Sequence, residues 1–124
     1  MPWTVSFDES NGIINACVSG TTTIKDHYGV LDEVLELCHK NGCLRLLIDL
    51  REWAYSRLGT IACFNFGRSV ARMSPDLRIA HVMPKDAQSR DDVYFACTVE
   101  ANRGVRAREF ETLEEATQWL LDGP

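Results

Sequence analysis

Positive charge and long apolar runs are both scarce in this sequence. Its 124 residues carry 13 Lys and Arg against 18 Asp and Glu, which gives a formal net charge of −5. Binding to phosphates requires clustered positive charge, so nucleic acid is not the expected partner. No apolar stretch approaches the roughly 20 residues that cross a bilayer, and the N-terminal Met1–Thr4 lacks the basic-then-apolar order of a secretory signal. We therefore expect a cytoplasmic protein without integral membrane association.

The five cysteines lack the pattern of a disulfide framework or of a metal site. An odd number without a signal peptide argues against a set of disulfides. The segment Cys38–Cys43 brings two thiols and His39 together, but no paired Cys/His motif supplies a fourth ligand. Because most of these cysteines have apolar neighbours, we predict reduced core residues and no metal ion.

Motifs for nucleotide binding and for hydrolysis are missing as well. Gly59 and Gly67 lack the spacing of either nucleotide fingerprint, so we predict no cofactor. None of the histidines His27, His39 and His81 stands beside a serine or cysteine in a nucleophile motif. We therefore assign no catalytic residue from the sequence.

The strongest positive signal is the aliphatic run Leu44–Leu50. It is too short for a globular helix and too continuous for a strand with one solvent-facing side. The run therefore predicts a central strand of a parallel sheet, covered on both faces. Asp49 falls at the predicted carboxyl end of this strand, where sheets of this kind hold their ligand crevices.

The rest of the chain alternates strands with helices. Further strands are expected at 3–7, 13–19, 78–83 and 105–110, and helices at about 24–40, 56–73 and 89–102 and from a capping box at 112–115. Strands separated by helices imply right-handed crossovers onto a mostly parallel sheet, and the initial hairpin adds an antiparallel strand. We predict one α/β domain over residues 1–124, with a mixed, mostly parallel β-sheet and the element order ββαβαβαβα.

This layout resembles the STAS domain superfamily, and within it the small single-domain bacterial proteins grouped as SpoIIAA-like. The resemblance covers nearly the whole chain and is carried by five short segments: Ile13-Ile14…Gly20, Leu46–Arg51, Arg78–Ala80, Asn102–Gly104 and Phe110…Ala116…Trp119-Leu120. It implies a sheet of four or five strands with helices packed mainly on one face. It also implies a regulatory role through partner docking, in some branches switched by phosphorylation and in others involving a small ligand. Lipid-carrying domains share a related architecture.

The phosphorylated branch of that superfamily directs attention to Ser56. That branch has an Asp-Ser-Ser-Gly-like motif at the start of the helix after the central strand. Here the corresponding stretch is Glu52–Gly59, in which the flanking acid and the second serine are missing. We therefore predict that Ser56 is a helix N-cap whose hydroxyl accepts a backbone N–H, in preference to a phosphorylation site.

Two groups of side chains near the central strand are candidates for binding. Asp49, Arg51 and Ser56 could line a polar crevice facing a helix N-terminus, where a small anion would bind. In the alternative, Asp49 tethers the following loop and Arg51 is solvated.

The second group is aromatic. Trp53 and Tyr55 fall in a predicted loop, where large apolar side chains need a cavity or a partner. Phe64 and Phe66 are two residues apart on a predicted helix, so one of them should be partly exposed. These rings form either an apolar patch with Trp53 or Phe66 as interface anchor, or a local cluster with one ring in solvent.

Taken together, these observations favour a non-enzymatic regulatory module that binds a protein partner or a small ligand, with a homodimer left open. Two alternatives make structural demands. A carrier for a small apolar or lipid-like ligand requires a cavity near Trp53–Phe66. An enzyme using Asp49 and His81 as acid and base requires those two side chains to converge in one cleft.

Overall fold

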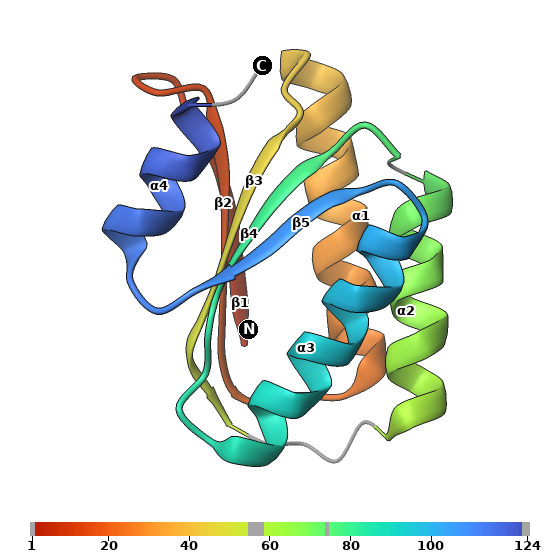
Figure 1. The fold of residues 1–124 in the computed structure, drawn as a ribbon. Helices are drawn as coiled ribbons and strands as arrows, with labels where there is room; N and C mark the ends of the chain where they lie inside the picture. Colours follow the sequence, from red (N-terminus) through yellow and green to blue (C-terminus); the bar gives the residue numbers. More distant parts are fainter. Residues whose placement is uncertain (1, 55–58, 74, 123–124) are drawn as a thin grey trace.

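A five-stranded mixed sheet lies between two unequal helical layers (Figure 1). The computed structural model describes residues 2–54, 59–73 and 75–122. Over these residues the elements follow the predicted order ββαβαβαβα. The strands are β1 (Trp3–Asp8), β2 (Ile13–Thr21), β3 (Arg45–Ala54), β4 (Arg78–Val82) and β5 (Arg106–Phe110). The helices are α1 (Ile24–Asn41), α2 (Thr60–Met73), α3 (Ala87–Asn102) and α4 (Leu113–Asp122).

The sheet keeps the order of the chain, β1-β2-β3-β4-β5, with β3 at its centre. β1 runs antiparallel to β2, and the other neighbouring pairs are parallel. Leu46 of β3 pairs with Ile14 of β2 on one side and with Ile79 of β4 on the other. The prediction that the aliphatic run forms a central strand of a mixed, mostly parallel sheet is confirmed.

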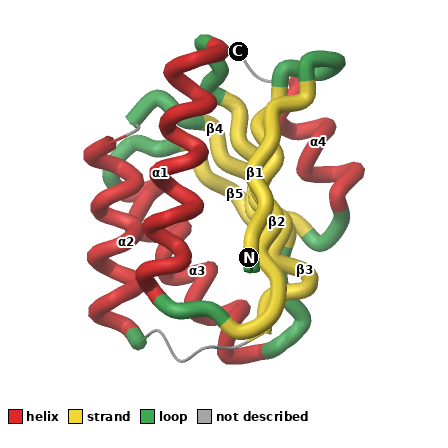
Figure 2. Tube along the Cα trace, turned by 180° about the vertical axis from the view of Figure 1, so that it is seen from behind, coloured by secondary structure: helices red, strands yellow, loops and turns green. Residues whose placement is uncertain are grey.

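Helices α1, α2 and α3 cover one face of the sheet, and α4 covers part of the other (Figures 1 and 2). Alternate residues of a strand point to opposite faces. Accordingly, Leu46 and Leu50 belong to the main core under α1–α3, whereas Leu47 packs with Ala116 and Leu120 of α4. The expectation of helices mainly on one face is confirmed.

The central strand is longer than the sequence predicted. β2 continues to Thr21 after a shift of register between Cys17 and Ser19, and its end pairs with residues 52–54. The added pairing extends β3 to Ala54, four residues beyond the predicted end. The prediction of a loop at Trp53 is therefore wrong.

Reciprocal side-chain contacts mark the starts of two helices. At α1, Thr23 N donates to Asp26 Oδ2 (2.8 Å) and Asp26 N donates to Thr23 Oγ1 (3.3 Å). At α4, Glu115 N donates to Thr112 Oγ1 (3.2 Å), and the Thr112 hydroxyl donates to the Glu115 carboxylate (3.0 Å). These contacts satisfy N–H groups that a helix start leaves without partners.

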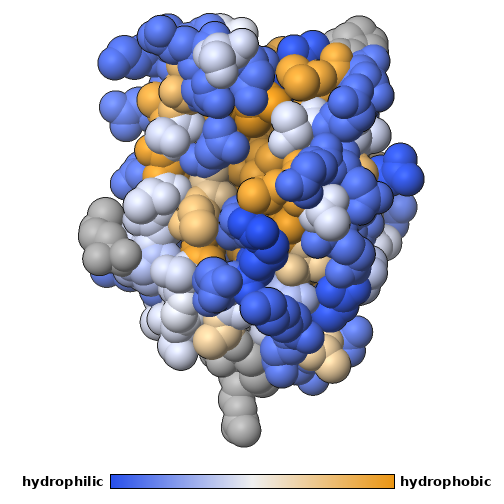
Figure 3. All heavy atoms as spheres, turned by 90° about the vertical axis from the view of Figure 1, so that its left-hand side faces the viewer, coloured by the Kyte–Doolittle hydropathy of each residue, from blue (hydrophilic) through white to orange (hydrophobic). Residues whose placement is uncertain are grey.

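The α4 side of the sheet is only partly covered. Figure 3 looks onto this side and shows hydrophobic side chains in a band flanked by hydrophilic ones. Phe110, Leu113 and Trp119 are partly buried against the small core beneath α4.

Measured over the described residues, no helix combines the length and the apolar character that a bilayer crossing demands.

Candidate functional site

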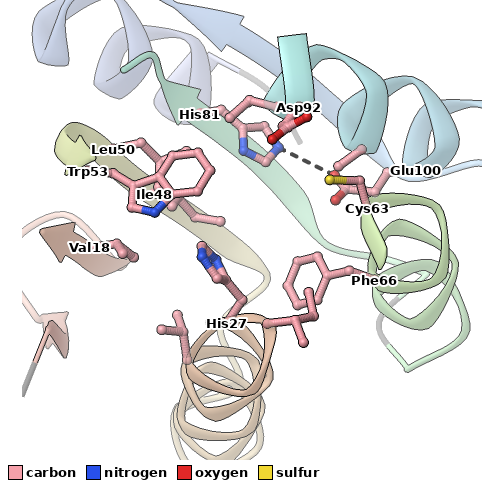
Figure 4. Close-up of a pocket in the computed structure, with 14 residues that line it drawn as sticks. Val18, His27, Ile48, Leu50, Trp53, Cys63, Phe66, His81, Asp92 and Glu100 are labelled. Carbon is pink, nitrogen blue, oxygen red and sulfur yellow. Dashed lines mark hydrogen bonds and ion pairs between the residues drawn. The ribbon is translucent and has the colours of Figure 1, made fainter. Parts of the chain in front are cut away.

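A cavity of about 80 Å³ lies between the sheet and helices α1–α3 (Figure 4). Since a water molecule needs about 10–15 Å³ of such volume, the cavity has room for roughly five to eight non-hydrogen atoms. Most of its wall is apolar, from Val18, Ile24, Val30, Ile48, Leu50, Trp53, Phe66, Val93 and Ala96. Five residues add polar groups: His27, Cys63, His81, Asp92 and Glu100.

Strand alternation and an irregularity in the β2–β3 pairing, where β3 has one extra residue, determine which side chains of the sheet line the cavity. Ile48 and Leu50 point to the α1–α3 face. In a strand with unbroken alternation, Trp53 would point to the α4 face. The register shift between Cys17 and Ser19 changes the alternation, and Trp53 lies in the main core with 4% of its surface exposed. Bulges commonly redirect a side chain in this way.

Trp53, Thr22 and His27 form a hydrogen-bonded chain at the cavity. Trp53 Nε1 donates to Thr22 Oγ1 (2.8 Å), and Thr22 Oγ1 lies 2.7 Å from His27 Nε2. Burial lowers the pKa of His27 to about 4, so its ring is neutral at pH 7. The contacts are satisfied when the Thr22 hydroxyl donates to Nε2, which leaves the ring proton on Nδ1. The His27 ring also meets Trp53 edge to face, with 5.2 Å between centroids.

Asp92 lines the cavity and carries a buried acceptor without a hydrogen-bond partner. Its Oδ2 is one of two buried side-chain polar atoms without a hydrogen-bond partner among the described residues. Burial raises the pKa of Asp92, Gln88 opposes this through a hydrogen bond, and Asp91 and Asp86 add to the rise. Burial, with a further contribution from Asp92, also raises the pKa of the Cys63 thiol to about 11. Cys63 is therefore a protonated thiol at neutral pH.

The buried pair His81 and Glu100 closes the cavity on the same side as Asp92. Figure 4 shows His27 below the space, His81, Asp92 and Glu100 above it, and Trp53 beside it. His81 and Glu100 are 5% and 1% exposed, and His81 Nε2 lies 3.3 Å from Glu100 Oε1. A carboxylate this deeply buried is stable only when it is paired.

The structure places Asp49 and Arg51 away from this cavity. Asp49 pairs in register with Val82, a member of the core under α4, so its side chain lies on the α4 face. Arg51 Nε and Nη2 donate to the two carboxylate oxygens of Asp49 (3.0 and 2.9 Å), and Arg51 N donates to Asp49 Oδ1 (3.1 Å). This pairing lowers the pKa of Asp49. His81 lines the cavity on the opposite face, so Asp49 and His81 do not converge.

The aromatic candidates divide into separate environments. Trp53 and Phe66 both line the cavity, whereas Phe64 does not. Phe64 instead lies beneath the guanidinium groups of Arg68 and Arg103, at 5.6 and 5.2 Å from the ring centroid. Burial of Trp53 rules out its predicted role as an exposed interface anchor.

Tyr55 and Ser56 lie outside the described residues, so the predictions made for them stay predictions. The next helix, α2, begins at Thr60, because the preceding Gly59 has a left-handed backbone (φ 84°) and is not helical, so the predicted start of this helix at about residue 56 is wrong.

Sequence reasoning missed His27, Asp92 and Glu100 as residues of one site. Hydropathy alone assigns charged residues to the surface, and these three come from two helices far apart in the chain. A usable signal was the spacing of Cys97 and Glu100, which places an acid on the same helix face as a buried cysteine.

Comparison with known proteins adds no assignment. No protein-family model matches the chain, and no curated protein matches it.

Proposed function

We propose that this protein is a non-enzymatic module that binds a small, largely apolar ligand in the cavity between the sheet and α1–α3. The observation that carries the proposal is an apolar cavity with a buried, unpartnered carboxylate oxygen in its wall. Small-molecule sites commonly combine apolar walls with a few placed polar groups.

The polar groups define the chemistry of the ligand. Leaving a buried acceptor without a donor costs about 1–3 kcal/mol, and more for a charged group. A ligand N–H or O–H on Asp92 Oδ2 would remove that cost. The neutral His27 and the apolar side chains of Trp53 and Phe66 favour an uncharged, apolar remainder. We therefore expect a compact amine or alcohol with an aromatic or branched aliphatic body.

A STAS-like assignment remains part of the proposal. It is supported by the element order, the central position of β3 and the packing of most helices on one face. In that setting, ligand occupancy would regulate docking to a protein partner. Of the roles considered from the sequence, carriage of a small apolar ligand is the one that a cavity beside Trp53 and Phe66 specifically favours.

Calorimetric titration with benzylamine and toluene tests the proposal. The two probes share a ring and nearly the same size, but toluene has no hydrogen-bond donor. At about 0.5 kcal/mol per non-hydrogen atom, well below the ceiling of about 1.5 kcal/mol for the smallest ligands, the dissociation constant of benzylamine would lie near the millimolar range. Benzylamine should bind about tenfold or more tightly than toluene, since hydrogen bonds to a charged group contribute about 1.5–3 kcal/mol.

Two substitutions of neighbouring acids make a matched comparison. Asp92→Asn should remove most of the preference for benzylamine, whereas Asp91→Asn makes the same charge change at an exposed position of α3 and should preserve it. Filling the cavity with Ala96→Leu should abolish binding of both probes. Equal binding of benzylamine to wild type and the Ala96→Leu variant would place the binding elsewhere and reject the proposal.

A further inference from the structure

The geometry points to a divalent metal site, suited to zinc, formed by His81, Cys97 and Glu100 at the wall of the cavity. Among the described residues, these three offer ligand atoms that all lie within 4.8 Å of one another. The inference goes beyond the proposed function, and it holds whether or not an apolar ligand occupies the cavity.

The three residues come from two packed elements. His81 lies on β4, and Cys97 and Glu100 lie three residues apart on α3, which places them on one helix face. All are buried, with 5%, 3% and 1% of their surfaces exposed. The rigid strand and helix hold the donors in place without support from a loop.

The separation of the two harder donors fits a shared metal ion. Zinc binds histidine nitrogen and carboxylate oxygen at about 2.0–2.1 Å with tetrahedral angles, which sets such ligand atoms about 3.3 Å apart. His81 Nε2 and Glu100 Oε1 are 3.3 Å apart. A charge-assisted hydrogen bond between such groups is normally shorter, at about 2.7–2.9 Å.

The surrounding charge favours a cation. Glu109 of β5 pairs in register with His81, so it faces the same side of the sheet. Glu109 also hydrogen-bonds to Cys97. The acidic side chains of Glu100 and Glu109 and the imidazole of His81 therefore surround the Cys97 thiol. A bound dication would compensate this excess of acidic groups and stabilise the thiolate.

The donor set selects the type of metal. Nitrogen, sulfur and oxygen together suit zinc, whereas magnesium and calcium favour all-oxygen sites. Three protein ligands leave a fourth position. His81 and Glu100 line the cavity, so a water molecule or a polar group of a cavity ligand can fill it. On binding, the Cys97 S–H bond breaks, the sulfur keeps the electron pair as its bond to the metal, and the proton passes to solvent.

Cobalt(II) provides a spectroscopic probe of this site. The whole protein, first treated with a chelator and then freed of it, would be titrated with Co²⁺ while its absorption is recorded. We expect a thiolate-to-cobalt charge-transfer band that saturates at one equivalent and disappears when Zn²⁺ is added. Wild-type protein that develops no such band would overturn the site without recourse to any variant.

Two cysteine variants identify the ligand. Cys97→Ala should lose the charge-transfer band, whereas Cys63→Ala, which replaces another buried cysteine and one that lines the cavity, should keep it. Circular dichroism would confirm that both variants are folded. If Cys97→Ala does not fold, X-ray absorption of the wild-type cobalt protein replaces it, with one sulfur ligand expected and none contradicting the site. A band that survives in folded Cys97→Ala also contradicts it. The cobalt titration tests the metal site and the benzylamine titration tests the ligand cavity, so a failure of one proposal can be told from a failure of the other.

Discussion

Gly67 permits the close packing of α2 on α3 beside the cavity, and replacing it by alanine should separate the two helices. A Cβ atom built at Gly67 would lie 2.9 Å from the carbonyl oxygen of Ala96 and 3.0 Å from Val99 Cβ. Favourable non-bonded contacts between carbon atoms lie at about 3.5–4.0 Å. The nearest obstacle is helix backbone, so relief requires the helices to move apart.

The magnitude follows from two opposing effects. Overpacking of this kind typically costs about 1–3 kcal/mol. Replacing glycine by alanine inside a helix recovers about 1 kcal/mol. We therefore expect the free energy of unfolding to fall by about 1 kcal/mol in Gly67→Ala, with weaker probe binding because Ala96 lines the cavity.

Gly29 of α1 provides the matched control. It is also helical, but a Cβ there meets the outer ring atoms of Trp3 at 3.0 Å, and a side chain can move more easily than a helix backbone. Gly29→Ala should therefore be neutral or more stable than wild type. Urea denaturation followed by circular dichroism would compare the three proteins. Equal stability of the two variants would refute the steric account of α2–α3 packing.

The buried hydrogen-bonded chain at His27 gives two further expectations. The folded-state pKa of His27 is lowered from 6.5 to about 4. The contribution of the neutral ring to the free energy of unfolding is therefore fully present above pH 6.5 and is lost as pH falls toward 4. The loss amounts to about 3 kcal/mol in total. Denaturation curves of wild type and His27→Gln at several pH values would check this, and a difference independent of pH would contradict it. Thr22→Val removes the acceptor of the Trp53 indole and should cost about 1–3 kcal/mol. Thr21→Val, on the exposed neighbour, should cost less than about 0.5 kcal/mol, and equal losses would count against the hydrogen-bonded chain.

Local patterns in the sequence were sufficient to predict the architecture. The aliphatic run Leu44–Leu50 has no polar alternation because β3 is covered on both faces, so its central position was readable. The three- and four-residue spacing of apolar side chains and the capping-box motif at 112–115 likewise predicted helices that the structure contains. In these cases the information lies within a few neighbouring residues.

The candidate site required information that neighbouring residues do not carry. Trp53 enters the core because the distant end of β2 pairs with β3, and no local pattern in Arg51–Ala54 reports that pairing. Glu100 is buried because His81 meets it from another element. The weak apolar periodicity of α3 hides this, since its inward face carries polar residues where a core helix would have apolar ones.

The most direct test of the central claim uses the indole N–H signals of three tryptophans. Trp53 lines the cavity, whereas Trp119 is part of α4 and packs against the core on the opposite face of the sheet. In proton–nitrogen correlation spectra recorded during a benzylamine titration, the account predicts that the Trp53 signal shifts progressively and saturates while the Trp119 signal stays in place. A Trp53 signal that remains fixed while benzylamine binds would contradict the assignment of the cavity as the binding site.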